Sequence, residues 1–284
     1  MLTIVHQPLS LNPALSILAS RMGQIDVQIQ EELAHCGVLS IQLDREAEVW
    51  VGVDQRLRPS LSKTSFKVLV VVEPPDVQNL CTDGFDVVLS WHASQLTLPA
   101  ARLFIAAAPW LLPTEWADLQ TKKQTGIGFL RGAKTTTEGH RIRHNLWKAM
   151  HGLQMPLPTI LIEGGVSRAE RNRQFLGQFV VVIENSSHPN YFTEKLLDAM
   201  LCQCVPLYWG CTNIGDFFDV SGIVMLEGDM DDILGTVLSL SENDFSCRRE
   251  AAQRNCDLAQ SYGGDFGKRV QRAIETSLPE KGCE

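Results

Sequence analysis

Short apolar runs alternate with polar segments along the first half of the chain. Most of these runs are four to eight residues long and rich in β-branched residues, which is typical of buried strands, and amphipathic stretches between them indicate helices near 13–23 and 31–35. This alternation predicts an α/β unit. The strands expected here are 2–5, 38–43, 47–53, 66–72, 85–90 and 103–107.

The second half repeats the pattern after a polar segment, 112–124, which has no apolar period and is interpreted as a linker. The expected strands are 126–130, 159–162, 179–183, the apolar run that starts at Val205, and 223–226. The expected helices are one that starts near Glu138, then 167–174, a helix capped by Thr193, 230–240 and a tail broken at Gly263 and Gly264. We predict two domains, 1–115 and 116–284 with the helical tail, and a functional cleft between them.

Composition limits the function. The 284 residues carry a formal charge of −8, so neither a nucleic-acid surface nor an anionic membrane surface is expected. No run approaches the roughly 20 apolar residues of a membrane span, and we expect a cytoplasmic protein without an integral membrane segment. The eight cysteines form no regular disulfide framework, and Cys202 and Cys204 are interpreted as buried thiols rather than a metal or redox pair.

The segment 178–210 carries the most informative chemistry. A buried strand stops at Glu184 and Asn185, and Thr193 can cap the following helix, which puts Glu194 and Lys195 in its first turn. The N-terminus of a helix attracts phosphate groups. With an arginine from 138–150, this set suits a diphosphate, and Glu194 can accept hydrogen bonds from a ribose.

Several familiar motifs are absent from the sequence. It contains no GxGxxG after a strand, no GxxxxGK[ST] and no GxSxG. These absences disfavour a dinucleotide oxidoreductase, a P-loop enzyme and a serine hydrolase.

The run ENSSHPNYFTEKLLDAM, followed by VPLYWG, resembles the donor-site motif of the α-1,3-fucosyltransferases, glycosyltransferase family 10. The resemblance is clear over 126–219, weaker over 66–107, and absent from the first 60 residues and the tail. It implies two Rossmann-like domains facing across a cleft, the GT-B type. It also implies that GDP-fucose binds mainly to the C-terminal half and a glycan acceptor mainly to the N-terminal half.

The resemblance also implies roles for individual residues. Arg143 matches a phosphate-binding arginine of the family, although Arg141 or a solvated basic helix face are alternatives. Glu73, which follows the strand 66–72, falls where the family has its catalytic carboxylate; the alternative is a carboxylate that caps the next turn. The candidate donor-binding residues are Arg143, Glu184, Asn185, Tyr191, Glu194 and Lys195.

These residues predict an inverting sugar transferase. Cations and helix N–H groups can stabilise the departing diphosphate, so no metal or other cofactor is expected at the site. A carboxylate such as Glu73 can take the proton from the acceptor hydroxyl, and its proline and apolar neighbours can raise its pKa. Asp229, Asp231 and Asp232 are interpreted as a helix start rather than a metal motif. The alternatives are a transferase for another nucleotide sugar and a noncatalytic nucleotide-sugar-binding module.

Overall fold

The computed structural model describes residues 2–5, 38–41, 49–54, 66–77, 81–262 and 266–277. The helices expected near 13–23 and 31–35 lie outside these residues. Contacts divide the chain into two units: unit 1 comprises Met1–Ala106 and Gly264–Glu284, and unit 2 comprises Ala107–Gly263. The units divide after residue 106, before the predicted boundary at 115/116, and the tail after residue 263 is grouped with unit 1. The predicted folding domains themselves stay a prediction.

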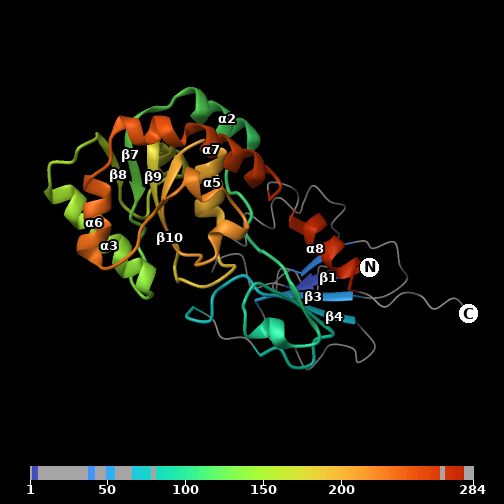
Figure 1. Cartoon of the computed structure of the whole chain (residues 1–284). Coiled ribbons are helices and arrows are strands. Elements are labelled where there is room, and N and C mark those ends of the chain that lie inside the picture. The colour runs from blue at the N-terminus through green and yellow to red at the C-terminus, as the bar shows by residue number, and fades with distance from the viewer. Residues whose placement is uncertain are drawn as a thin grey trace, which may run out of the picture. The chain divides into compact units, whose positions relative to one another are not determined.

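Unit 1 contains a six-stranded sheet in the order β2-β1-β3-β4-β5-β6. β2 runs antiparallel to β1, and the other neighbouring strands are parallel. Val68, Leu69 and Val70 of β4 are buried, as expected of a parallel strand covered on both faces. The elements are β1 (Leu2–Val5), β2 (Val38–Ile41), β3 (Val49–Val53), β4 (Phe66–Val70), β5 (Val87–Ser90), the 3₁₀ turn η2 (Gln95–Thr97), β6 (Ala101–Leu103) and α8 (Phe266–Glu275) (Figure 1).

Unit 2 contains a five-stranded parallel sheet in the order β11-β10-β9-β7-β8. Its strands are β7 (Gln124–Leu130), β8 (Thr159–Ile162), β9 (Gly177–Ile183), β10 (Val205–Trp209) and β11 (Val224–Met225). Its helices are α2 (Pro113–Thr121), α3 (Glu138–Gly152), α4 (Arg168–Asn172), α5 (Glu194–Leu201), α6 (Met230–Leu238) and α7 (Glu242–Gln260). Short 3₁₀ turns are η3 (Arg173–Leu176), η4 (Ile214–Asp216) and η5 (Val220–Gly222).

The strand order of unit 2 creates a switch point between β7 and β9. From β7 the chain crosses to β8 on one side, and it then returns to build β9, β10 and β11 on the other. Counted along the chain this is the order 2-1-3-4-5, which is common in doubly wound α/β sheets, where ligands bind at the carboxyl ends of the strands beside the switch point.

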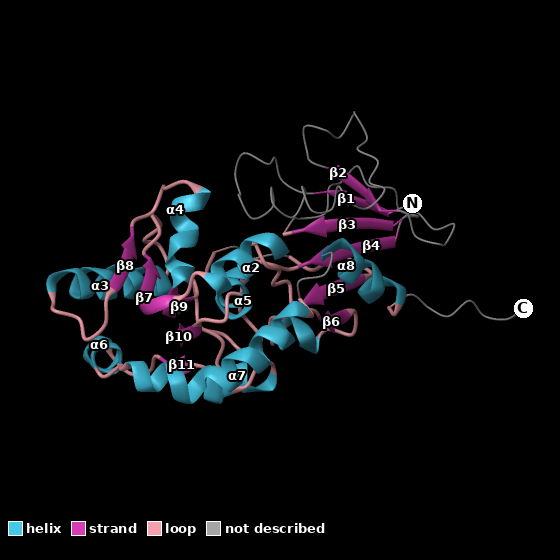
Figure 2. Cartoon of the chain, turned by 90° about the horizontal axis from the view of Figure 1, so that it is seen from above, coloured by secondary structure: helices cyan, strands magenta, loops and turns pink. Residues whose placement is uncertain are grey.

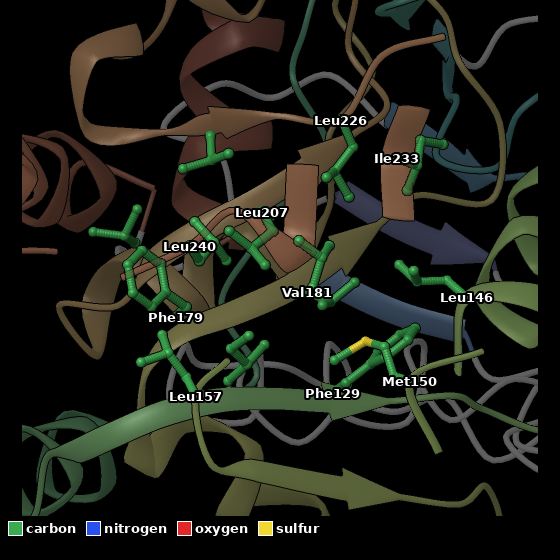
Figure 3. Packing of buried hydrophobic residues seen from close by; sticks show 14 of the residues in the cluster. Phe129, Leu146, Met150, Leu157, Phe179, Val181, Leu207, Leu226, Ile233 and Leu240 are labelled. Atoms are coloured by element: carbon green, nitrogen blue, oxygen red, sulfur yellow. The ribbon is translucent and has the colours of Figure 1, made fainter. Parts of the chain in front are cut away.

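Helices cover both faces of the unit 2 sheet. α3 and α6 lie on one side of the strands, and α2 and α5 lie on the other (Figure 2). Phe179, Val181 and Ile183 of β9 pack with Leu146 of α3 and Ile233 of α6 in one apolar core (Figure 3). The alternate residues of β9 face α5, because successive side chains of a strand point to opposite faces.

The structure confirms most of the expected elements but corrects two of them. The segment predicted as a linker forms α2, which starts with Pro113 at its first position and buries Leu119. It escaped recognition because a helix that buries so few side chains has no apolar period. The strand expected at 103–107 is β6, which ends at Leu103.

Candidate functional site

The candidate site of unit 2 is formed at the carboxyl ends of β7 and β9. Here α3 passes very close to the end of β9: the Gly139 N–H donates to the Asn185 carbonyl oxygen over 3.1 Å. A Cβ atom at residue 139 would lie 1.8 Å from the Glu184 carbonyl oxygen, so only glycine permits this approach. The approach brings the first turns of α3 next to the Glu184–Asn185 segment.

Arg143 lies one turn further along α3 and is only 8% exposed. Its Nη2 donates to Asn185 Oδ1 over 2.8 Å. Burial lowers the pKa of Arg143, and the negative charges of Glu184 and Glu194 act in the opposite direction; an arginine still keeps its charge at neutral pH. Arg141 is exposed and turns towards the Thr136 carbonyl oxygen at 3.4 Å, so the structure brings Arg143, and not Arg141, next to Asn185.

The N-terminus of α5 provides the other half of the site. Thr193 is its N-cap, as predicted, and its Oγ1 accepts from the Lys195 N–H at 3.3 Å. The Lys195 ammonium donates to Thr193 Oγ1 and to Glu194 Oε1, each at 3.0 Å. The first turn of α5 therefore carries a cation and an anion that face each other.

Glu184 has no exposed surface, and its carboxylate is engaged by the same helix start. Oε1 accepts from the Thr193 N–H at 2.9 Å, Oε2 accepts from the Thr193 hydroxyl at 2.7 Å, and Lys195 Nζ lies 3.6 Å from Oε2. Burial raises the pKa of Glu184. Burial lowers the pKa of Lys195, but Glu194 and Glu184 outweigh it, and the net pKa is raised. The buried carboxylate of Glu184 thus contacts both Thr193 and Lys195.

These contacts define a charged cluster, by which we mean Arg143, Glu184, Asn185, Thr193, Glu194 and Lys195. Tyr191 belongs to the loop that enters the cluster; it is 3% exposed, and its ring packs edge-on to the His188 imidazole at 6.5 Å between centroids. The predicted donor-binding residues in unit 2 therefore lie in one region.

A cavity of about 190 Å³ opens next to the charged cluster. Arg143, Glu194 and Lys195 line one part of it. Its lining also includes three residues that sequence reasoning did not select: Trp110, Arg171 and Asp198. Its volume is below the roughly 300–1,000 Å³ that is typical of pockets for small-molecule ligands.

Asp198, one turn after Glu194 on α5, holds the chain that enters α2. It is 4% exposed, and its Oδ1 accepts from the N–H groups of Trp110 at 2.9 Å and Leu111 at 3.1 Å. Burial raises the pKa of Asp198 to about 7. The Arg171 guanidinium stacks over the Trp110 ring, 4.8 Å from its centroid. These contacts join residues that lie far apart in sequence. Their one sequence signal is an aspartate, Asp198, among the apolar residues of α5.

Glu73, the predicted base, lies in unit 1 on the loop after β4 and is partly buried. Its N–H donates to Asp54 Oδ2 over 3.1 Å. Asp54 follows β3 and is 6% exposed; burial raises its pKa to about 7, with a further contribution from the charge of Glu73. Sequence reasoning did not select Asp54, because its partners lie on the loop that follows the neighbouring strand β4.

Two other sequence predictions can be compared with the described residues, those for Asp229 and for the cysteines. Asp229 caps α6 by accepting from the Asp231 N–H at 2.9 Å, which confirms the helix start. Cys202 and Cys204 are buried free thiols, as expected. Among the residues that the structure describes, no group of three or more His, Cys, Asp or Glu side chains is arranged to hold a metal ion, and no helix is long and apolar enough to cross a membrane.

Known proteins resemble this chain in sequence and in fold, although no family profile matches it. The sequence is 31% identical over 109 residues to an alpha-(1,4)-fucosyltransferase of Arabidopsis thaliana. That stretch makes up 38% of this chain and 26% of the plant protein, so the match spans about a quarter of the relative's length.

Two solved structures share the fold. A crystal structure of an alpha1,3-fucosyltransferase with GDP-fucose aligns at a TM-score of 0.54 and 14% identity, covering 84% of this chain and 80% of that one. Another alpha1,3-fucosyltransferase structure aligns at a TM-score of 0.53 and 12% identity, over 99% of this chain and 91% of that one. The resemblance that the motif indicates is therefore confirmed: the chain is similar to fucosyltransferases in sequence over 109 residues and in fold over most of its length.

Proposed function

We propose that this protein is an inverting glycosyltransferase that moves L-fucose from GDP-fucose to a hydroxyl group of a glycan acceptor. The observation that carries the proposal is the charged cluster beside the switch point of unit 2, where Arg143 and Lys195 lie with Glu194 at the edge of a cavity. The 31% identity to an alpha-(1,4)-fucosyltransferase over 109 residues, and the GDP-fucose bound in a structure of similar fold, support this choice of donor.

In the proposed donor complex, the diphosphate binds between the Arg143 guanidinium and the N-terminus of α5. Arg143 has donors beyond the Nη2 group used by Asn185, because a guanidinium carries five N–H groups in a fixed fork. Lys195 adds a second positive charge, and the N-terminus of α5 adds the positive end of the helix dipole. These groups stabilise the negative charge that develops on the departing GDP.

Glu194 has a different proposed role, because a ribose offers hydroxyl donors to a carboxylate. It lies in the first turn of α5, one residue before Lys195, and accepts from the Lys195 ammonium. Glu184 has both oxygens bonded and no exposed surface, so we assign it to orienting Thr193 and Lys195 rather than to direct donor contact. Asn185 fixes Arg143, and Tyr191 supports the loop.

The proposed base is Glu73 of unit 1. Inversion requires an acceptor oxygen that attacks the sugar from the side opposite the diphosphate, and a base that removes the proton of that hydroxyl. We propose that units 1 and 2 meet in the GT-B manner during the reaction, so that Glu73 and the donor share one site. The base then comes from one unit and leaving-group stabilisation from the other.

A ligand screen followed by a transfer assay tests the proposal. Thermal unfolding is measured with GDP-fucose, GDP-mannose, UDP-galactose and UDP-N-acetylglucosamine, because a ligand at 100 times its dissociation constant stabilises the native state by about 2.7 kcal/mol. We expect the largest rise in melting temperature with GDP-fucose. No rise with any guanine nucleotide contradicts the proposal, and a larger rise with a UDP-sugar indicates a transferase for another donor.

Transfer is then measured with N-acetyllactosamine and lacto-N-biose, disaccharides that differ in which hydroxyl of N-acetylglucosamine is free. The anomeric configuration of the product is read by NMR. We expect fucose in the configuration inverted from the donor, and loss of transfer but not of donor binding in Glu73→Gln. A general base typically contributes about 10²- to 10⁴-fold to the rate. Binding without transfer to any acceptor glycan indicates a noncatalytic module.

A further inference from the structure

The loop that carries Glu73 is fixed by the elements on both sides of it. Val71 donates its N–H to the Leu89 carbonyl oxygen of β5 over 2.9 Å, and the Trp91 indole Nε1 donates to the Val72 carbonyl oxygen over 3.2 Å. Trp91 is 2% exposed. The main chain just before Glu73 is therefore anchored to β5 and the segment after it.

Asp54, which follows β3, holds the same loop from its other side, and it bonds the main chain of Glu73 itself. Its own N–H donates to the Val70 carbonyl oxygen over 2.9 Å, which places its side chain beside the end of β4. Oδ1 then accepts from the Val72 N–H at 2.8 Å, and Oδ2 accepts from the Glu73 N–H at 3.1 Å. The two oxygens of one carboxylate thus fix two consecutive peptide groups, the second belonging to Glu73 itself.

The conformation of Asp54 is adapted to this contact. Its φ of 49° lies in the left-handed region, which residues other than glycine, asparagine and aspartate seldom adopt. Its carboxylate is buried next to a second carboxylate, an arrangement that raises its pKa to about 7. Perturbed pKa values cluster at functional sites.

We propose that Asp54 is a positioning residue for Glu73: by holding the peptide groups of residues 72 and 73, its carboxylate sets the direction in which Glu73 presents its own carboxylate to the acceptor hydroxyl. This inference rests on the proposed function. It assigns Asp54 no contact with substrate, because its two oxygens are directed at the main chain.

Asp54→Asn is the direct test. Asparagine also adopts the left-handed region, so the backbone is kept, while one oxygen is replaced by an amide group that cannot accept from an N–H. The matched control is Asp86→Asn: Asp86 is exposed and accepts from the Lys67 N–H at 2.7 Å, at the opposite end of the same strand β4. Asp54→Gly is a second variant that fits the same backbone and also removes the carboxylate.

Two quantities are measured for each variant: kcat for transfer, and the dissociation constant for GDP-fucose. We expect Asp54→Asn and Asp54→Gly to lower kcat by on the order of 10- to 100-fold, the loss typical of a misplaced catalytic group. The dissociation constant for GDP-fucose should change less than twofold, because the donor binds in unit 2. Asp86→Asn should keep both values.

A double variant shows whether Asp54 acts through Glu73. In the Glu73→Gln background, adding Asp54→Asn should cause no further loss of the residual transfer rate, because effects of coupled residues are not additive. The inference is overturned by a folded Asp54→Asn variant with wild-type kcat, or by an equal loss of rate in both backgrounds. A Glu73→Gln variant with the wild-type rate overturns the proposed base and this inference together, whereas loss of rate in Glu73→Gln but not in Asp54→Asn overturns the inference alone.

Discussion

Replacing Thr193 with valine removes one hydroxyl group from the centre of the charged cluster while keeping the shape of the side chain. The hydroxyl donates to Glu184 Oε2 at 2.7 Å, and it accepts from the Lys195 N–H at 3.3 Å and the Lys195 ammonium at 3.0 Å. A single change therefore removes a helix cap, one partner of a buried carboxylate and one partner of the lysine. Thr193→Ser is the matched control, because serine keeps the hydroxyl and loses only a methyl group.

The contacts give the expected magnitude. Loss of an N-cap costs about 1 kcal/mol of stability. Leaving a buried acceptor such as Glu184 Oε2 without a donor costs about 1–3 kcal/mol more. We therefore expect Thr193→Val to lower the free energy of unfolding by about 2–4 kcal/mol, and Thr193→Ser to lower it by less than about 1 kcal/mol, the value of a buried methylene.

Urea unfolding followed by tryptophan fluorescence measures the stability of both variants, and calorimetric titration with GDP-fucose measures binding. Because the Lys195 ammonium loses one of its fixed partners, we expect the dissociation constant of Thr193→Val to rise about tenfold, which corresponds to 1.4 kcal/mol. Equal unfolding midpoints and equal affinities for the valine and serine variants would refute the role given to this hydroxyl.

Three further outcomes follow from the charged cluster and its neighbours. Arg143→Lys keeps the charge but not the fork of donors, so GDP should bind about tenfold more weakly in titration calorimetry, with Arg141→Lys as an unaffected control. Burial, with the positive charges nearby, lowers the pKa of His140 to about 4, below its value near 6.5 in the unfolded chain. The neutral imidazole therefore contributes stability that is complete above pH 6.5 and is lost as the pH falls towards 4. Over this range the free energy of unfolding falls by up to about 1.4 kcal/mol per pH unit. Urea unfolding at several pH values should show a smaller slope for His140→Asn, and an unchanged slope contradicts the assignment. The pKa of Asp198 is about 7, and the negative charge of a bound diphosphate should raise it further. Asp198 should then take up as much as about half a proton at pH 7 when the diphosphate binds. Calorimetry in buffers of different ionisation enthalpy should detect this proton uptake in the wild type but not in Asp198→Asn.

The sequence predicts those parts of the fold and site that depend on local patterns. The strand 159–162 is predicted with its observed bounds because it is a short apolar, β-branched run, and the Thr193 cap is predicted because capping is a local interaction. α2 was missed because it buries little apolar surface.

Contacts between distant segments could not be predicted in this way. Asp54 meets its partners 18 and 19 residues later, and Asp198 meets the Trp110 N–H across 88 residues. The burial of Glu184 was also unexpected, because glutamate is seldom fully buried unless it is paired. Residue type and spacing therefore found the side chains at the proposed donor site, but not the ones that hold the main chain around it.

Burial explains how a chain with a net charge of −8 can offer a site for a diphosphate. Burial raises the pKa of Asp198 to about 7, so near neutral pH part of its negative charge is removed. The same environment cannot neutralise Arg143, whose guanidinium stays protonated, and the pKa of Lys195 is raised rather than lowered. The positive charges of Arg143 and Lys195 are therefore kept at the cavity, while the negative charge of Asp198, which also lines it, is reduced. A net charge of −8 is then compatible with an anionic donor, because salt screens distant exposed charges much more than the partly buried charges next to the donor.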